Sequence, residues 1–335
     1  MFLEFYGLRE QPFGVTPDPR FIYMGPAHRE ALASLYYGIE SGRGFMALIA
    51  RPGMGKTTLL FQLLEKFRGN ARTAFLFQTQ CNSREFMRFL LTELGSENHE
   101  QDFVRMHDEF NKLLLQEARA GRPLIVVVDE AQNLDPSVLE TIRLLSDFET
   151  PKAKLLQIIL AGQPELADKL ATRQLAQLRQ RISMLSGLSP LSEIECANYI
   201  QHRLRIAGYS GAPLFTPDAM QAIAQFTEGI PRSINNFCFN ALSLGCALRE
   251  RVISAAIVAE VISDLDIGKH LTEVPPRPPL DPENFGPVAK KNLAPLHTAP
   301  FAAESEAGTP LTSTQARAYI EQLSGQLRDW KRTLD

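Results

Sequence analysis

Hydrophobic residues along the chain form short apolar runs that alternate with stretches of three- and four-residue periodicity. The apolar runs predict strands over residues 45–50, 73–79, 124–128 and 155–160. The periodic stretches predict helices over residues 28–39, 56–67, 83–94, 107–120 and 137–147. An unbroken run such as residues 124–128 is typical of a strand that is buried on both faces of a parallel sheet. The alternation therefore predicts an α/β fold with right-handed crossovers and a central parallel sheet.

After residue 190 the pattern changes, and it predicts only helices, over residues 191–207, 217–227, 233–248 and 254–264. The first forty residues are rich in proline and aromatic residues, so we expect no helix before residue 28 and a segment that lies along the surface of the domain after it. Residues 271–311 contain nine prolines and no periodicity, which is typical of a flexible linker. Periodicity returns in residues 312–335, which predicts an amphipathic helix that either binds a partner or folds back on its own domain.

Five parts of the chain follow from these patterns. They are an N-terminal extension and helix that pack on the α/β core (1–43), the α/β domain itself (44–188), a small all-helical lid domain (189–268), a proline-rich linker (269–311) and the C-terminal amphipathic helix (312–335).

Composition excludes several classes of protein. A formal charge of −3 excludes a protein that binds nucleic acid through an overall positive charge. It does not exclude a local basic patch. The four cysteines are far apart without a Cys-x-x-Cys pair, which favours free, mostly buried thiols in a reducing compartment. No apolar run approaches the roughly 20 residues of a membrane span, and the N-terminus does not resemble a secretion signal. We therefore expect a cytoplasmic protein.

The strongest chemical motif lies between the strand at 45–50 and the helix at 56–67. Its residues are Arg51, Pro52, Gly53, Met54, Gly55, Lys56, Thr57 and Thr58. Two glycines allow a tight turn whose backbone N–H groups surround phosphate oxygens, and the following helix adds its positive end. Lys56 would reach the β- and γ-phosphates, and Thr57 would bind Mg²⁺. The consensus begins with glycine where this chain has Ala50, a small residue that closes the strand.

A second motif supports the first. The strand at 124–128 ends in Asp129 and Glu130, about 70 residues after the phosphate loop. Asp129 at the tip of the strand would hold Mg²⁺ through water, and Glu130 would polarise the water that attacks the γ-phosphate. The two motifs together predict ATP and Mg²⁺ as ligands.

Four further polar residues are candidates for the same reaction. Gln163, at the end of the strand at 155–160, would contact the γ-phosphate or the attacking water; the alternative is a polar turn. Arg181, with Arg179 as second choice, would reach the γ-phosphate of a neighbouring subunit; the alternative is a surface salt bridge. Arg232, which opens a helix in the helical domain, would close onto the nucleotide; the alternative is an arginine in solvent.

This order of elements resembles the AAA+ ATPases, and further residues resemble the general secretion pathway protein A (ExeA) family within them. The motifs that carry this resemblance are Phe5-Tyr6-Gly7-Leu8, Pro12-Phe13, Pro17-Asp18-Pro19, Tyr23, His28-Arg29-Glu30-Ala31-Leu32, Tyr37-Gly38-Ile39, Asp129-Glu130-Ala131-Gln132 and Ala161-Gly162-Gln163-Pro164-Glu165-Leu166. The resemblance covers about residues 1–268 and implies ATP hydrolysis, homo-oligomerisation and work on cell-envelope assembly. Membrane-bound relatives continue into a transmembrane helix and a peptidoglycan-binding domain, where this chain has the proline-rich linker and a short helix.

Three functions are consistent with these residues. The first is an oligomeric ATPase that assembles or remodels a secretion or exopolysaccharide-export complex, recruited to the inner membrane by an unknown protein partner, with residues 312–335 as a candidate contact. The second is a slow, nucleotide-controlled binding switch. The third is a DNA-binding regulator of transposition, suggested by a local excess of basic residues, although a subunit interface is the favoured explanation of these charges. The basic residues are Lys152, Lys154, Lys169, Arg173, Arg179 and Arg181.

Overall fold

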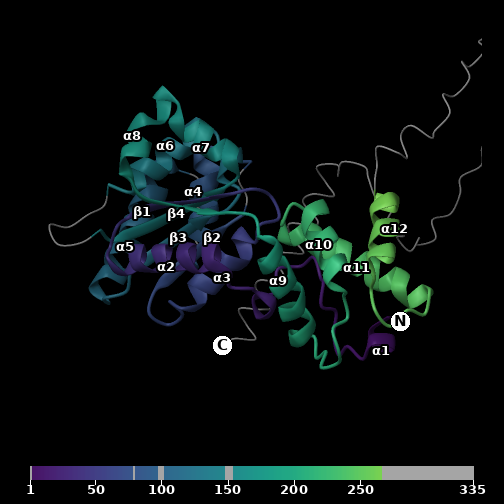
Figure 1. Ribbon diagram of the computed structural model, residues 1–335. Coiled ribbons are helices and arrows are strands. Elements are labelled where there is room, and N and C mark those ends of the chain that lie inside the picture. Colours follow the sequence, from purple (N-terminus) through teal and green to yellow (C-terminus); the bar gives the residue numbers. More distant parts are fainter. Residues whose placement is uncertain (1, 78–79, 97–101, 148–153, 266–335) are drawn as a thin grey trace, which may run out of the picture. The chain divides into compact units, whose positions relative to one another are not determined.

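The computed structural model describes residues 2–77, 80–96, 102–147 and 154–265, which all belong to one unit that spans residues 1–275. The expected linker and C-terminal helix, and Lys152, lie outside the described residues. Helices and strands alternate from residue 45 onward, and helices alone follow the last strand (Figure 1). The predicted fold class is confirmed: a central parallel sheet is followed by an all-helical region.

Five parallel strands form the sheet in the order β2-β3-β4-β1-β5. Their bounds are β1 Phe45–Ala50, β2 Arg72–Leu76, β3 Leu124–Val128, β4 Leu156–Gly162 and β5 Ile182–Leu188. The first and third strands are the apolar runs of the sequence, with the bounds expected for them. Since β4 lies between β3 and β1, the residues that follow these three strands meet at one edge of the sheet.

Alternate residues of each strand pack into different clusters, because successive side chains point to opposite faces of a sheet. In β3, Val126 and Val128 join one cluster with helices α4, α5 and α6, while Ile125 and Val127 join the other with helices α2 and α3. Figure 1 shows helices on both sides of the sheet. The sheet is therefore covered on both faces. The helices are α2 Pro26–Glu40, α3 Lys56–Glu65, α4 Ser83–Glu93, α5 Phe103–Arg119, α6 Pro136–Leu145, α7 Pro164–Ala171 and α8 Ala176–Arg181.

The helical region consists of α9 Glu193–Ile206, α10 Pro217–Phe226, α11 Pro231–Ala247 and α12 Ala255–Leu265. Start signals in the sequence explain two of these helices. The Thr216 hydroxyl caps α10, with Pro217 at the first helical position. Ser192 and Glu195 form a reciprocal capping box at the start of α9.

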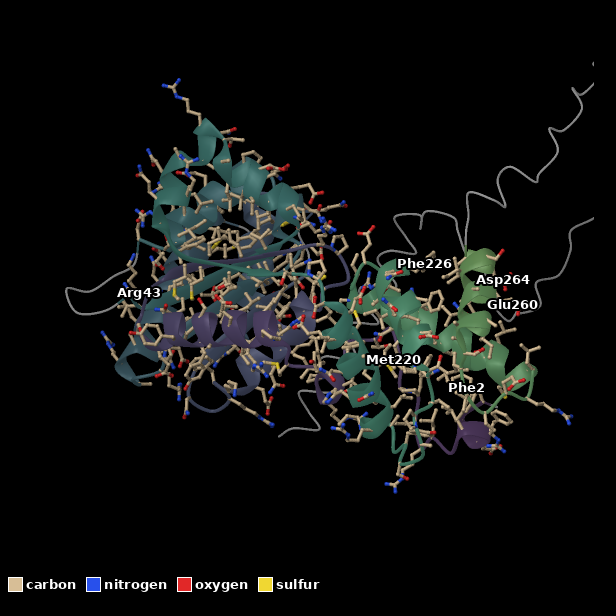
Figure 2. All side chains as sticks on the ribbon, viewed as in Figure 1. Phe2, Arg43, Met220, Phe226, Glu260 and Asp264 are labelled. Atoms are coloured by element: carbon tan, nitrogen blue, oxygen red, sulfur yellow. The ribbon has the colours of Figure 1, made fainter. Side chains whose placement is uncertain are left out.

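The N-terminal extension differs from the expectation in two ways. Residues Phe2–Tyr6 form the short helix α1, and Pro19–Phe21 form the 3-10 turn η1. Phe13 and Phe21 are only 1% and 4% exposed, and they lie in the apolar cluster of the helical region rather than on the sheet. Phe2, labelled in Figure 2, lies on α1. Its ring contacts that of Phe239 of α11 edge to face, with ring centres 5.6 Å apart. Burial of these large aromatic side chains makes the segment part of a core.

The sequence pattern missed the edge strand β5 and the short helices α7 and α8. In β5 exposed and more buried positions alternate, but the apolar residues do not follow this alternation, because Leu185 lies on the exposed side and Ser186 on the buried side. This strand forms because β1 offers its whole length for pairing, from Phe45 opposite Ile182 to Ala50 opposite Leu188. Tertiary pairing therefore overrides a weak local preference.

Candidate nucleotide-binding site

The loop between β1 and α3 has the backbone that a phosphate site needs. Gly53 and Gly55 have φ values of 78° and 86°, in the left-handed region that glycine adopts without strain. A side chain at residue 53 would also lie 2.8 Å from the Arg232 Cβ atom. Gly55 is the N-cap of α3, so the loop leads directly into the first N–H groups of a helix. These groups and the helix dipole attract an anion to this turn.

Lys56 is 5% exposed and stands at the first position of α3. Its ammonium donates a hydrogen bond of 3.1 Å to the Ala50 carbonyl at the end of β1. An ammonium has three N–H donors, so one contact with the protein leaves others for phosphate oxygens. The Lys56 side chain lies on the wall of the cavity described below.

Asp129 and Thr57 meet at the base of the loop. The Thr57 hydroxyl donates to Asp129 Oδ2 at 2.5 Å, and Asp129 is 2% exposed. Burial raises the pKa of the Asp129 carboxyl, while the hydrogen bond from Thr57 opposes that shift. A hydroxyl and a carboxylate side by side are the hard oxygen ligands that Mg²⁺ prefers. The residues present therefore fit a magnesium ion.

Glu130 follows Asp129 in a left-handed conformation, with φ of 52°, which is uncommon for a residue with a side chain. Its carboxylate accepts a hydrogen bond of 3.0 Å from the Gln163 side-chain amide. Gln163 lies just after β4, between the strand that leads to Glu130 and the strand that leads to the phosphate loop. The structure therefore brings together residues that the sequence separates by more than 100 positions.

A cavity of about 380 Å³ joins these elements. Its walls include residues 52–58, Glu130, Gln163 and, from the helical region, Arg232. Residues 14–18 and 21–23 of the N-terminal extension complete the wall. Most of the site residues predicted from the sequence thus surround one cavity at the carboxyl edge of the sheet, where open α/β folds bind ligands.

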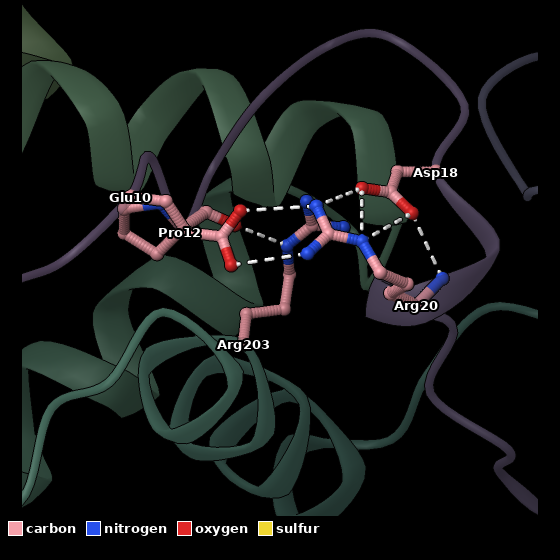
Figure 3. Close-up of polar contacts among 5 residues, drawn as sticks. All are labelled: Glu10, Pro12, Asp18, Arg20 and Arg203. Atoms are coloured by element: carbon pink, nitrogen blue, oxygen red, sulfur yellow. Dashed lines mark hydrogen bonds and ion pairs between the residues drawn. The ribbon is translucent and has the colours of Figure 1, made fainter.

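Arg203 of α9 fixes the part of the extension that lines the cavity (Figure 3). It is 8% exposed, and its Nε atom donates to the Pro12 carbonyl. Its guanidinium lies 4.8 Å from the centre of the Phe21 ring. Arg20, on the exposed side, pairs with Asp18 at 2.7 Å and with Glu10 at 3.0 Å. Sequence reasoning missed this role, although the aromatic and proline motifs of residues 12–23 marked the segment.

The start of α11 lies against the phosphate loop. The Arg232 N–H donates to the Gly53 carbonyl at 3.1 Å, and the Arg232 side chain lines the cavity. Arg51 points elsewhere: it is more than half exposed and forms an ion pair of 3.5 Å with Glu228. Both contacts join the loop to the helical region, so a movement of α11 changes the surroundings of the phosphate site directly.

Arg181 and Arg179 lie away from this cavity. Arg181 ends α8, immediately before β5, and is thus at the amino edge of the sheet. The five steps from Phe45 to Ala50 separate the two edges by about 16 Å at 3.3 Å per residue. Arg181 forms an ion pair with Asp147, and Arg179 donates to the Ala171 carbonyl at 3.0 Å. Neither arginine can contact a phosphate bound at its own loop without a large rearrangement.

Lys169 also has contacts within the chain. Its ammonium donates to the main-chain carbonyls of Gln132 and Leu134. Half of the six basic residues that suggested a DNA-binding patch, namely Lys169, Arg179 and Arg181, are thus engaged inside the described structure. These three side chains therefore have partners within their own chain.

His28 is a residue near the site that the sequence did not single out for chemistry. It is 5% exposed, and its Nε2 atom lies 3.0 Å from the Met54 carbonyl, which can only accept a hydrogen bond. Burial lowers the pKa of His28, which favours the neutral ring. The ring supports the phosphate loop through its contact with Met54. Its place in the motif His28-Arg29-Glu30 was the available signal.

Comparisons with known proteins agree with this geometry. Residues 39–170 match the AAA domain family. Among solved structures, the ORC2 protein of Aeropyrum pernix in its ADPNP–ADP complexes has a TM-score of 0.59 and 16% identity, covering 76% of this chain and 71% of that one. Cdc6p of Pyrobaculum aerophilum has a TM-score of 0.58 and 19% identity, covering 78% and 75% of the two chains. At such identities these two structures show the fold alone.

The chain therefore contains a domain of the AAA family, and a helical region follows its sheet. Within this class it is homologous to the general secretion pathway protein A of Aeromonas hydrophila, with 39% identity over 243 residues. That alignment covers 72% of this chain and 44% of the relative, so the chain spans less than half the length of the curated relatives it matches. Within the described residues, every helix is too short or too polar to cross a membrane.

Proposed function

We propose that the protein is a Mg²⁺-dependent ATPase that acts as a homo-oligomer to assemble or remodel a partner complex. The single observation that carries this proposal is the common cavity of the phosphate loop, Glu130, Gln163 and Arg232. The homology to general secretion pathway protein A favours a partner in secretion or a related cell-envelope process. The predicted cytoplasmic location, with recruitment to the inner membrane by a partner, belongs to the same proposal.

Each of these residues would have its own role in hydrolysis. The N–H groups of the loop and the Lys56 ammonium bind the β- and γ-phosphates. Glu130 orients and polarises the attacking water, and Gln163 lies beside it. Thr57 and Asp129 would hold the magnesium ion, which when bound offsets the negative charge of the phosphates. Arg232 would bring the helical region onto the nucleotide.

The position of Arg181 supports an oligomer. An arginine at the amino edge of the sheet is too far from the phosphate loop of its own chain, but it could complete the site of a neighbouring copy that faces this edge. A guanidinium there would stabilise charge in the transition state. Arg179, whose guanidinium donates to a carbonyl of its own chain, is the weaker candidate.

Two substitutions test the chemistry. Lys56→Ala should weaken ATP binding at least 10-fold, because the loop loses its cation, and Lys66→Ala, an exposed lysine on the same stretch, should not. Glu130→Gln should retain ATP binding while turnover falls about 10²-fold or more, with the exposed Glu30→Gln as control. Calorimetry gives the affinities and phosphate release gives the turnover. Wild-type turnover in either site variant would contradict the proposal.

A mixing experiment tests the oligomer. Arg181→Ala retains its own nucleotide site but offers no arginine to its neighbour, whereas Lys56→Ala retains Arg181 but binds ATP poorly. Each variant alone should turn over ATP very slowly, and an equimolar mixture should recover activity, because mixed interfaces unite an intact loop with an intact arginine. A mixture no faster than the average of its components would exclude action of Arg181 between subunits.

A further inference from the structure

Glu130 belongs to a closed ring of hydrogen bonds with Gln132 and Gln163. The Gln132 amide donates to Glu130 Oε2 at 2.6 Å, and the Gln163 amide donates to the same oxygen at 3.0 Å. The third contact closes the ring, because the Gln163 main-chain N–H donates to Gln132 Oε1 at 3.1 Å. We call these three residues the amide ring. The Gln132 side chain contacts both of the other members, since its amide donates to Glu130 and its carbonyl oxygen accepts from Gln163.

Two neighbours hold Gln132 in this position. Lys169 donates to the Gln132 main-chain carbonyl, which fixes the backbone of the turn after Glu130. Gly162, the last residue of β4, leaves room for the side chain, since a Cβ atom there would lie 2.9 Å from Gln132 Oε1. The Lys169 contact is with the main chain of Gln132 and does not involve its amide group. The amide can therefore be altered while its main-chain support remains.

The ring determines which carboxylate oxygen is available for chemistry. Two amide donors occupy Oε2 of Glu130, while the hydrogen bonds of the ring leave the other oxygen, Oε1, without an amide donor. A general base needs one oxygen directed at water and a fixed orientation. The Gln163 amide is also the candidate contact for the γ-phosphate, and a turn of this side chain toward the phosphate would weaken its hydrogen bond to Glu130. Gln132 then remains as the fixed donor to Glu130.

We infer that Gln132 is a positioning residue for hydrolysis: it orients the Glu130 carboxylate and couples it to the end of β4 at Gln163. This inference rests on the proposed ATPase function and extends it to a residue outside the phosphate loop. A carboxylate released from this ring would move through several rotamers, and misplacement by about 1 Å costs about 10²-fold in rate. Nucleotide binding depends on the loop and Lys56, with which the Gln132 side chain shares no hydrogen bond in the described structure.

The test uses the full chain with Gln132→Ala, which removes both contacts, and Gln132→Glu, which keeps the shape but replaces the donor with an oxygen. We expect kcat to fall at least 10-fold in both, with the dissociation constant for ATP and the KM within about twofold of wild type. Gln116→Ala, an exposed glutamine on α5, is the matched control and should behave as wild type. A purely structural role would alter binding and turnover together.

A double variant separates positioning from a general effect. If Gln132 acts through Glu130, then Gln132→Ala added to Glu130→Gln should not slow the residual turnover further. Additive losses would overturn the inference, as would wild-type kcat in Gln132→Ala or a matching loss of ATP affinity. Absence of hydrolysis in the wild-type chain is a different result, because it would refute the proposed ATPase itself.

Discussion

Gly229 offers a quantitative test of how the helical region is held against the phosphate loop. It precedes α11 and has φ of 67°, a conformation that costs an L-residue about 1–2 kcal/mol. A Cβ atom there would lie 2.9 Å from the Leu191 nitrogen and closer still to the Leu191 carbonyl oxygen. These are main-chain atoms, so no side chain can turn aside to make room. Gly229→Ala should also weaken the 2.9 Å hydrogen bond from the Leu191 N–H to the Gly229 carbonyl.

The expected loss of unfolding free energy adds three contributions. The left-handed backbone contributes about 1–2 kcal/mol, the hydrogen bond about 1 kcal/mol, and the forced displacement of the main chain about 1–2 kcal/mol. Together these contributions amount to about 3–5 kcal/mol. Gly69→Ala is the matched control, because Gly69 has φ of 79° but no atom within 4 Å of the point where a Cβ atom would lie. It should cost only the backbone contribution.

Urea unfolding followed by far-ultraviolet circular dichroism measures both variants. Gly229→Ala should also weaken ATP binding, since Arg232 three residues later donates to the Gly53 carbonyl, whereas Gly69→Ala should not. Equal losses of stability in the two variants would show that the contact with Leu191 has no energetic consequence. Such a result would refute our account of how the start of α11 is fixed.

Three further predictions concern buried charge. Burial lowers the pKa of His28 below 6.5, so as the pH falls the unfolded chain takes up a proton before the folded chain does. Below about pH 6.5 the unfolding free energy of the wild type should therefore fall, relative to that of His28→Gln, by up to about 1.4 kcal/mol per pH unit. Urea titrations at several pH values measure this difference, and parallel plots of stability against pH for the two proteins would contradict the prediction. Because burial raises the pKa of Asp129, Asp129→Asn should stabilise the ligand-free chain at pH 7, with the difference vanishing below about pH 4, where both forms are neutral. Arg203→Ala removes the hydrogen bond to Pro12 that holds the N-terminal part of the cavity wall, and it should raise the KM for ATP several-fold. An unchanged KM would show that this part of the wall does not contribute to nucleotide binding.

Local patterns in the sequence were sufficient for the elements with strong signals. The apolar run at 124–128 and the strand at 45–50 have the predicted bounds because burial on both faces of a sheet demands a continuous apolar sequence. The phosphate loop was equally visible, since its glycines and lysine are required by backbone geometry and charge. The roles of Lys56, Glu130, Gln163 and the arginines stay predictions.

Other features depended on contacts between distant parts of the chain. The edge strand β5 forms because β1 offers a partner, and nothing within residues 182–188 requires a strand. The packing of Phe13 and Phe21 in the helical region also escaped prediction, because periodicity indicates which residues are buried but not against which element.

The sequence by itself determined that a glycine-rich turn before a helix, an acidic strand end and a helical region exist in this chain, since each is encoded by neighbouring residues. Only the tertiary structure decided that Gln132 bridges Glu130 and Gln163, and that Arg181 lies at the opposite edge of the sheet from the loop. The physical reason is the strand order: placing β4 between β3 and β1 brings the three strand ends together, and parallel pairing keeps the start of β5 a full strand length away.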